Sequence, residues 1–210
     1  MEINTKDIVI EPAGPQDAQV SGQLIYATDP HLFDCYFNHD LDLRQTCMTQ
    51  WWHAKKGWFS HFGCRAAKFG DAVVGIEISF TRDEILENVR PTFIHAKKTM
   101  SPDAFKHFSE IFGDYVQYLF PAMPKDAYYV QSLAAADKAR GRGIGRLLLN
   151  RIFDRAKRRG LRLCQLDVAS DNPAVNFYRQ MGMTIVSESR VPYLEETFGV
   201  SGHYRMRKEL

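Results

Sequence analysis

The sequence has few cysteines, and none of them forms a recognisable pair. The 210 residues include four cysteines, with no CxxC spacing and no histidine at metal-ligand distance beside them. This pattern excludes a disulfide framework and a cysteine-based zinc site. His53 and His61 stand eight residues apart among tryptophans and phenylalanines, a setting typical of packed rather than metal-binding histidines. We therefore predict no metal and reduced, structural thiols at Cys35, Cys47, Cys64 and Cys164.

The sequence also lacks a long apolar run and an excess of charge. No segment approaches the roughly 18 apolar residues that cross a bilayer, and the N-terminus has no pattern of a secretory signal. Lys and Arg together number 27 against 25 Asp and Glu, so no global field favours nucleic acid or anionic lipid. No repeat or Gly/Ser linker divides the chain. We expect one domain over 1–210, in the cytoplasm and without a membrane partner.

The first half of the chain alternates between strand and helix patterns. With 45% hydrophobic residues the composition is that of a folded globule. Alternating residues predict a strand at 7–11, and Pro15 begins a helix that is followed by a second helical stretch at 41–58. The Gly70-Asp71 dipeptide predicts a hairpin between strands at 64–69 and 72–80.

Alternation along the second arm of this hairpin assigns side chains to two faces. An apolar face carries Val74, Ile76, Ile78 and Phe80, whereas the opposite face carries Val73, Gly75, Glu77 and Ser79. A carboxylate centred among small residues is a suitable wall for a cleft. We therefore predict that Glu77 faces a cleft.

The remainder predicts a helical segment and then regular alternation. A charged, helical pattern at about 82–125 is interpreted as an insertion, with helices at 83–88 and after Ser101. Strands are predicted from Tyr128, at 161–168, 183–191 and 203–209, with helices before Gly160 and at 172–182. This order predicts an α/β (α+β) fold, a sheet with helices on its faces.

A glycine-rich loop follows the strand that begins at Tyr128. Glycines at positions 141, 143 and 145 alternate with arginines just before a helix. Backbone N–H groups and the helix dipole can converge there on a phosphate, with arginines adding charge-assisted contacts. The loop lacks the Gly-Lys-Ser/Thr of a Walker loop and carries Arg146 where a dinucleotide fingerprint has glycine. Alternatively, the glycines permit close strand–helix packing and the arginines are solvated.

These residues resemble the GNAT superfamily of N-acetyltransferases. The family pattern Arg/Gln-x-x-Gly-x-Gly/Ala matches Arg140, Gly143 and Gly145, and a second family segment matches Asn172 and Tyr178. The resemblance covers about 128–191. It implies a mixed, mostly antiparallel sheet, splayed between the strands at Tyr128 and Leu161, flanked by helices on both faces and holding acetyl-CoA in the opening.

The resemblance also implies roles for individual residues. The backbone near Leu133 and Ala135 pairs with the pantetheine arm of acetyl-CoA. Asn172 helps to hold the same arm, although a spacing one residue shorter than in the family leaves Asp171 as an alternative. The pyrophosphate is held by Arg140, Gly141, Arg142, Gly143, Gly145 and Arg146.

Acetyl transfer needs a proton donor for the leaving thiolate, and it can use a base for the amine. By resemblance, Tyr178 is the general acid; the alternative is that it only packs against the sheet. The strand from Tyr128 lacks a carboxylate at the family's base position, so Glu77 is the predicted base. Alternatively, Glu77 pairs with a basic side chain and no side-chain base is needed.

The predicted function is direct transfer of acetyl from acetyl-CoA to a primary amine, in a small molecule or a peptide. Available aromatic residues for the acceptor pocket are Tyr36, Trp51, Trp52, Trp58, Phe59, Tyr193 and Tyr204. Nine basic residues against Asp154 in 140–162 leave a nucleic-acid-binding module as one alternative, and a non-catalytic acyl-CoA sensor is another. Strand edges near the C-terminus can support a homodimer.

Overall fold

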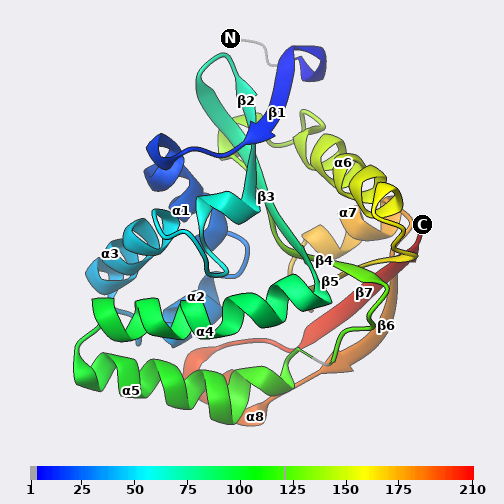
Figure 1. Ribbon diagram of the computed structural model, residues 1–210. Coiled ribbons are helices and arrows are strands. Elements are labelled where there is room, and N and C mark those ends of the chain that lie inside the picture. The colour runs from blue at the N-terminus through cyan, green and yellow to red at the C-terminus, as the bar shows by residue number, and fades with distance from the viewer. Residues whose placement is uncertain (1–3, 121) are drawn as a thin grey trace.

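The computed structural model describes residues 4–120 and 122–210, and its centre is a seven-stranded sheet (Figure 1). The strand order is β1-β2-β3-β4-β5-β7-β6, and among these described strands only the β4–β5 pair is parallel. This confirms the predicted mixed, mostly antiparallel sheet. The strands are β1 (Ile8–Pro12), β2 (Cys64–Phe69), β3 (Ala72–Thr81), β4 (Ala127–Ala135), β5 (Leu163–Ala169), β6 (Thr184–Ser189) and β7 (His203–Glu209).

The sheet opens between its two parallel strands. β4 and β5 pair from Ala127 opposite Leu163 to Val130 opposite Leu166. Beyond Val130, β4 remains paired only with β3 as far as Ala135, and β5 continues only against β7. The backbone edges that face each other in this opening are free to bind another chain-like molecule. The predicted splay is confirmed.

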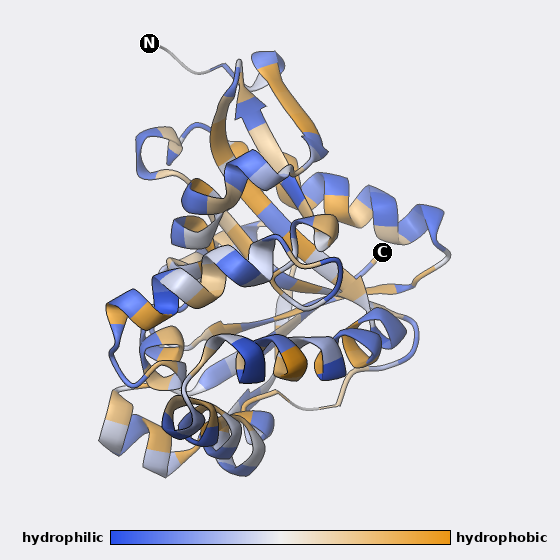
Figure 2. Cartoon of the chain, turned by 60° about the vertical axis from the view of Figure 1, so that its left-hand side comes forward, coloured by the Kyte–Doolittle hydropathy of each residue, from blue (hydrophilic) through white to orange (hydrophobic). Residues whose placement is uncertain are grey.

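Helices cover both faces of the sheet (Figures 1 and 2). They are α1 (Ala18–Tyr26), α2 (Pro30–Tyr36), α3 (Leu41–Trp52), α4 (Arg82–Thr99), α5 (Pro102–Glu110), α6 (Ile144–Arg158), α7 (Ala174–Gln180) and α8 (Pro192–Phe198). One core joins α1, α3, α4 and α5 to β3, and others join α6 and α7 to the opposite face. Figure 2 shows apolar and polar residues alternating along these helices, because each buries one side.

Four helices differ from the sequence predictions, either in their bounds or because they were not predicted. Asp29 and Pro30 begin α2, which the sequence analysis did not predict. α3 ends at Trp52 rather than 58, and the chain then turns, passing through Gly57 at a φ of +126°. α4 extends past the predicted residue 88 and through Pro91 to Thr99, since buried Thr92 and Ala96 anchor its second half. α8 was likewise not predicted.

A β-bulge changes the faces predicted for β3. The β2–β3 register shifts so that Ala67 lies opposite Gly75 and Lys68 lies opposite Val73. Val74 therefore packs with α6 residues, whereas Ile76, Ile78 and Phe80 pack on the other face. A bulge places two successive residues against one partner, so simple alternation fails at that point.

Candidate functional site

A large cleft occupies the opening between β4 and β5, and its volume is about 1090 Å³. Its lining comes from β4 and β5, from the loop that precedes α6, from α7, and from aromatic residues of α2. Most of the residues predicted to hold the cofactor or to act as the acid meet here. They are Leu133, Ala135, Arg140, Gly141, Gly143, Gly145, Arg146, Asn172 and Tyr178.

The glycine-rich loop needs its glycines for backbone conformation. Gly141 and Gly143 have φ values of +73° and +81°, which side chains rarely adopt. The first hydrogen bond of α6 runs from the Leu147 N–H to the Gly143 carbonyl. The N–H groups of the preceding helical residues, 144–146, therefore have no acceptor within the helix and sit at its positive end. This arrangement suits an anion.

The loop's arginines differ in position. Arg146 lines the cleft and is exposed. Arg140 also lines it and forms an exposed ion pair with Asp137 at 3.0 Å. Arg142 does not belong to the lining. A Cβ at Gly145 would meet the Phe177 ring at 3.4 Å, an ordinary van der Waals contact, so packing against α7 does not by itself require glycine at this position.

Tyr178 lies on α7, is buried and lines the cleft. Its hydroxyl makes no hydrogen bond with another described residue. Burial raises the pKa of the phenol well above its usual value, and nearby Cys164 adds to the effect. The hydroxyl is therefore protonated at neutral pH and able to donate.

Asn172 and Asp171 take different positions at the start of α7. The Asn172 carbonyl oxygen accepts from the Ala174 N–H at 2.9 Å, and its amide donates to the Thr28 carbonyl at 3.4 Å. Asp171 accepts from the Ser201 hydroxyl at 2.8 Å and is not part of the cleft lining. Of the two alternatives for the pantetheine arm, only Asn172 lines the cleft.

Glu77 does not face the cleft, so the prediction that it forms the cleft wall is wrong. It is 1% exposed and absent from the lining. α6 covers this face of β3, and the Arg155 guanidinium on that helix lies 2.5 Å from a Glu77 oxygen, while Ser79 donates to the other at 2.7 Å. The carboxylate is thus held away from any substrate in the cleft, which leaves no position for it as the base.

The sequence analysis missed a polar network at the far end of the cleft. Arg205 donates to both Asp167 oxygens, at 2.9 and 2.6 Å, and the Tyr129 hydroxyl donates to Asp167 at 2.9 Å. His203 lies 2.7 Å from Asp29. Burial alone lowers the pKa of His203, but the hydrogen bond and charge of Asp29 outweigh it, and the pKa is raised.

Only some of the candidate aromatic residues reach the cleft. Tyr36, Trp58 and Phe59 line it, whereas Trp51 and Trp52 are buried in the core. Tyr193 and Tyr204 are not part of the lining. The aromatic wall lies beyond the glycine-rich loop, on the α2 side. An acceptor and a cofactor arm could therefore meet inside one cavity.

The four cysteines are free and buried, as predicted. Burial raises the pKa of Cys35, Cys47 and Cys164 to about 12 and that of Cys64 further, so none is a reactive thiolate. Among residues 4–120 and 122–210, no group of three or more His, Cys, Asp or Glu side chains could hold a metal ion. Within the same residues, no helix is both long and apolar enough to cross a membrane.

Comparisons with known proteins agree with this geometry. The model of the acetyltransferase (GNAT) family matches residues 25–183. An N-acetyltransferase structure from Staphylococcus aureus Mu50 aligns with a TM-score of 0.72 and 16% identity, covering 95% of this chain and 100% of that one. A comparison with curated proteins finds no match.

Two further solved structures contain the cofactor. A GNAT family acetyltransferase from Elizabethkingia anophelis, with acetyl-CoA bound, aligns with a TM-score of 0.54 and 13% identity over 97% of this chain and 99% of that one. A Bacillus subtilis acetyltransferase in complex with CoA aligns with a TM-score of 0.54 and 12% identity over 97% of each chain. At such identities these likenesses show the fold.

Proposed function

Because the chain belongs to the acetyltransferase (GNAT) family, we propose that it transfers an acetyl group from acetyl-CoA directly to a primary amine bound in the same cleft. The observation that carries this proposal is the opening between β4 and β5, which joins a glycine-rich anion site to an aromatic wall in one cavity. Both reactants would be held together before transfer, which removes most of the entropic cost of their encounter.

The residues of the cleft fit acetyl-CoA. The free N–H groups at the start of α6, with Arg140 and Arg146, would hold the pyrophosphate. The unpaired edge of β4 at Leu133 and Ala135 would hydrogen-bond the pantetheine amides, with Asn172 facing it from α7. When bound, acetyl-CoA supplies the acetyl thioester that reacts.

Tyr178 would act as the proton donor. The neutral amine nitrogen attacks the carbonyl carbon, a C–N bond forms, and the C–S bond breaks. A backbone N–H of β4 near Leu133 would stabilise the carbonyl oxygen as charge develops on it. The Tyr178 hydroxyl, which bonds to no other residue in 4–120 or 122–210, donates its proton to the leaving sulfur and regains one from solvent.

The amine would lose its proton to water rather than to a side-chain carboxylate. Among the described residues, the cleft lining includes two carboxylates, Asp29 and Asp167, and each is already paired, with His203 and Arg205 respectively. A carboxylate held in such a pair is a poor base, because taking a proton would break the pair. The acceptor is therefore an amine that is partly neutral near physiological pH.

A calorimetric titration with acetyl-CoA tests the cofactor assignment. We expect micromolar binding that weakens roughly tenfold in Arg146→Gln, which loses a charge-assisted contact. Arg142→Gln is the matched control, because Arg142 is in the same loop but outside the cleft lining, and it should change affinity far less. No binding by folded wild-type protein would refute the proposal.

A screen of amines, monitored by release of CoA, tests transfer. Product formation supports the enzyme, whereas tight acetyl-CoA binding without transfer to any amine would favour the acyl-CoA sensor. The homodimer, the cytoplasmic location and the absence of a nucleic-acid partner stay predictions.

A further inference from the structure

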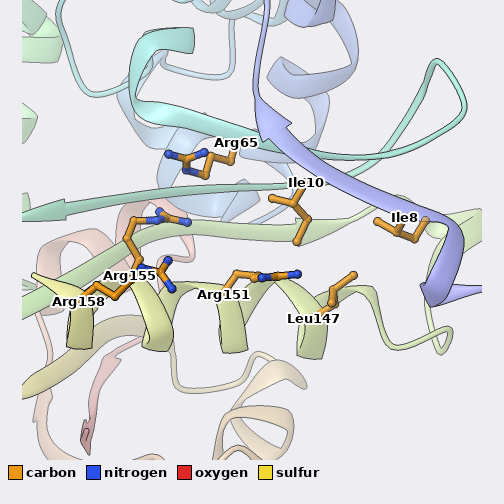
Figure 3. Close-up of a pocket in the computed structure, with 7 residues that line it drawn as sticks. All are labelled: Ile8, Ile10, Arg65, Leu147, Arg151, Arg155 and Arg158. Carbon is orange, nitrogen blue, oxygen red and sulfur yellow. The ribbon is translucent and has the colours of Figure 1, made fainter.

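A second cavity lies on the opposite side of α6 from the sheet opening, between that helix and the β1–β2 edge (Figure 3). Its volume is about 340 Å³, and it shares no lining residue with the large cleft. We call it the arginine groove. Its lining consists of Ile8, Ile10, Arg65, Leu147, Arg151, Arg155 and Arg158.

The arginine groove has one apolar end and one basic end. In Figure 3, Ile8 and Leu147 lie at one end, and Arg155 and Arg158 lie at the other. The residues from α6 are spaced by four, four and three positions, so they form one stripe on the helix surface. Ile8 and Ile10 reach the same stripe from β1 because alternate residues of a strand share a face.

The positive charge of the groove is mostly uncompensated. Glu77 pairs with Arg155 at 2.5 Å and lies 4.0 Å from Arg65. In the described part of the chain, Arg151 and Arg158 form no ion pair. Asp154, the acid of the same helix, also forms none there. Four guanidinium groups therefore meet a single carboxylate.

Neighbouring arginines behave differently. Arg159 pairs with Glu84 at 2.8 Å, and Arg162 pairs with Asp126 at 2.6 Å. Arg159 and Arg162, which lie outside the groove, thus have acidic partners of their own, whereas Arg151 and Arg158 have none among the described residues. Like charges gathered in one groove repel each other, and a multivalent anion would relieve that repulsion.

We propose that the arginine groove binds an organic oligophosphate, with its phosphates on Arg151, Arg155 and Arg158 and its apolar part on Ile8 and Leu147. Guanidinium groups bind phosphate through paired N–H donors. Arg151 and Arg158 are seven residues apart, which is about 10.5 Å along a helix. Because the arginine side chains are long and flexible, the two outer guanidinium groups can close this span onto the ends of one triphosphate chain, with Arg155 between them.

Titrations with ATP and with inorganic tripolyphosphate test this proposal. We expect one ATP per chain, bound more tightly than tripolyphosphate because only ATP has an organic part to cover the apolar end. The double variant R151Q/R158Q should bind ATP at least roughly tenfold more weakly, since it loses two charge-assisted contacts. The matched control R90Q/R179Q removes two exposed arginines outside the groove and should bind within about twofold of wild type.

Two further variants have different purposes: one distinguishes the groove from the glycine-rich loop, and the other tests the apolar end of the groove. Arg146→Gln should leave the affinity for ATP unchanged. Ile8→Ser should weaken the binding of ATP without weakening the binding of tripolyphosphate. The proposal is overturned if ATP does not bind, if the groove double variant binds like wild type, or if Arg146→Gln alone abolishes binding. Equal affinity for ATP and tripolyphosphate would refute the role of the apolar end.

Discussion

Arg205 and Asp167 lie directly opposite each other on β7 and β5, and the guanidinium binds both carboxylate oxygens at 2.9 and 2.6 Å. Both side chains are almost fully buried, at 6% and 1% exposure. Removing one partner of such a buried pair destabilises the protein strongly, because the other charge is then left buried without compensation. It also fixes Asp167 against the Tyr129 hydroxyl at the end of the cleft.

Replacing Arg205 by glutamine should therefore destabilise the protein by about 3–5 kcal/mol, measured by urea unfolding. The matched control is Arg162→Gln, which breaks the surface pair with Asp126 and should cost about 1 kcal/mol or less. Similar losses of unfolding free energy in the two variants would show that the Arg205–Asp167 pair does not stabilise the pairing of β5 with β7.

His203 should make stability depend on pH. Its pKa is raised in the folded protein: burial alone would lower it, and the hydrogen bond and charge of Asp29 outweigh that effect. A group with a raised folded pKa stabilises most below its unfolded pKa, about 6.5 for histidine, and loses that contribution as pH rises through the folded value. The extra unfolding free energy of wild type relative to His203→Gln should therefore decrease as the pH rises from about 6.

Urea unfolding at several pH values measures this difference. Asp29→Asn is the control, because asparagine can still cap α2 but carries no charge to hold the imidazolium. In that background the extra stability at low pH should disappear. If the stability of wild type relative to His203→Gln increased with pH, the charged His203–Asp29 pair would be contradicted.

Local sequence signals predicted the parts of the fold that depend on local geometry. The hairpin around Gly70 and the loop of Gly141 and Gly143 both require positive φ, and both lie where the pattern indicated. The parted strands followed from the family resemblance, and the pairing of β4 with β5 confirms them. The hairpin and the loop depend on local geometry alone, whereas the parted strands were predicted only because the family's fold contains them.

Features that depend on distant contacts could not be predicted in this way. Asp29 and His203 are 174 residues apart, and only the tertiary fold brings the start of α2 next to the start of β7. The position of Glu77 was predicted from alternation along β3, but alternation does not say what covers each face. α6 supplies both that cover and the Arg155 partner from 78 residues away.

Glycine substitutions in the loop before α6 should separate folding from cofactor binding. Gly143→Ala forces an alanine to a φ of +81° and should cost about 1–2 kcal/mol of stability while weakening acetyl-CoA binding. At Gly145 an added Cβ would make only an ordinary van der Waals contact with Phe177. Gly145→Ala should therefore keep wild-type stability and weaken only acetyl-CoA binding, because the new methyl group enters the anion site.

Unfolding curves and acetyl-CoA titrations on the same two variants provide the measurements. If Gly145→Ala bound acetyl-CoA like wild type, the backbone of α6 at this position would not approach the cofactor.

Glu77→Gln should reduce stability and leave the chemistry intact. The substitution leaves the Arg155 guanidinium without its buried counter-charge, so we expect a loss of about 3–5 kcal/mol in urea unfolding. The fraction that remains folded should show the wild-type dependence of kcat on pH, since Glu77 does not line the cleft. Disappearance of a basic limb from that pH profile, with stability unchanged, would restore Glu77 as the base.

Tyr178→Phe removes the proposed proton donor without removing a structural hydrogen bond. Because the hydroxyl bonds to no other described residue, the melting temperature should stay close to that of wild type. General acid catalysis typically contributes 10²–10⁴-fold, so kcat should fall by roughly that factor while the Kd for acetyl-CoA changes little. Steady-state kinetics and calorimetry measure the two quantities separately.

The control for Tyr178 is Tyr193→Phe, which removes a hydroxyl outside the cleft lining and should leave kcat unchanged. An acetyl donor made from a thiol more acidic than that of CoA releases a better leaving thiolate, so it needs less protonation at sulfur. Tyr178→Phe should therefore lose less activity with that donor than with acetyl-CoA. Equal losses with both donors would mean that the Tyr178 hydroxyl positions the reactants and does not protonate the leaving group, because only proton donation depends on the basicity of the departing sulfur.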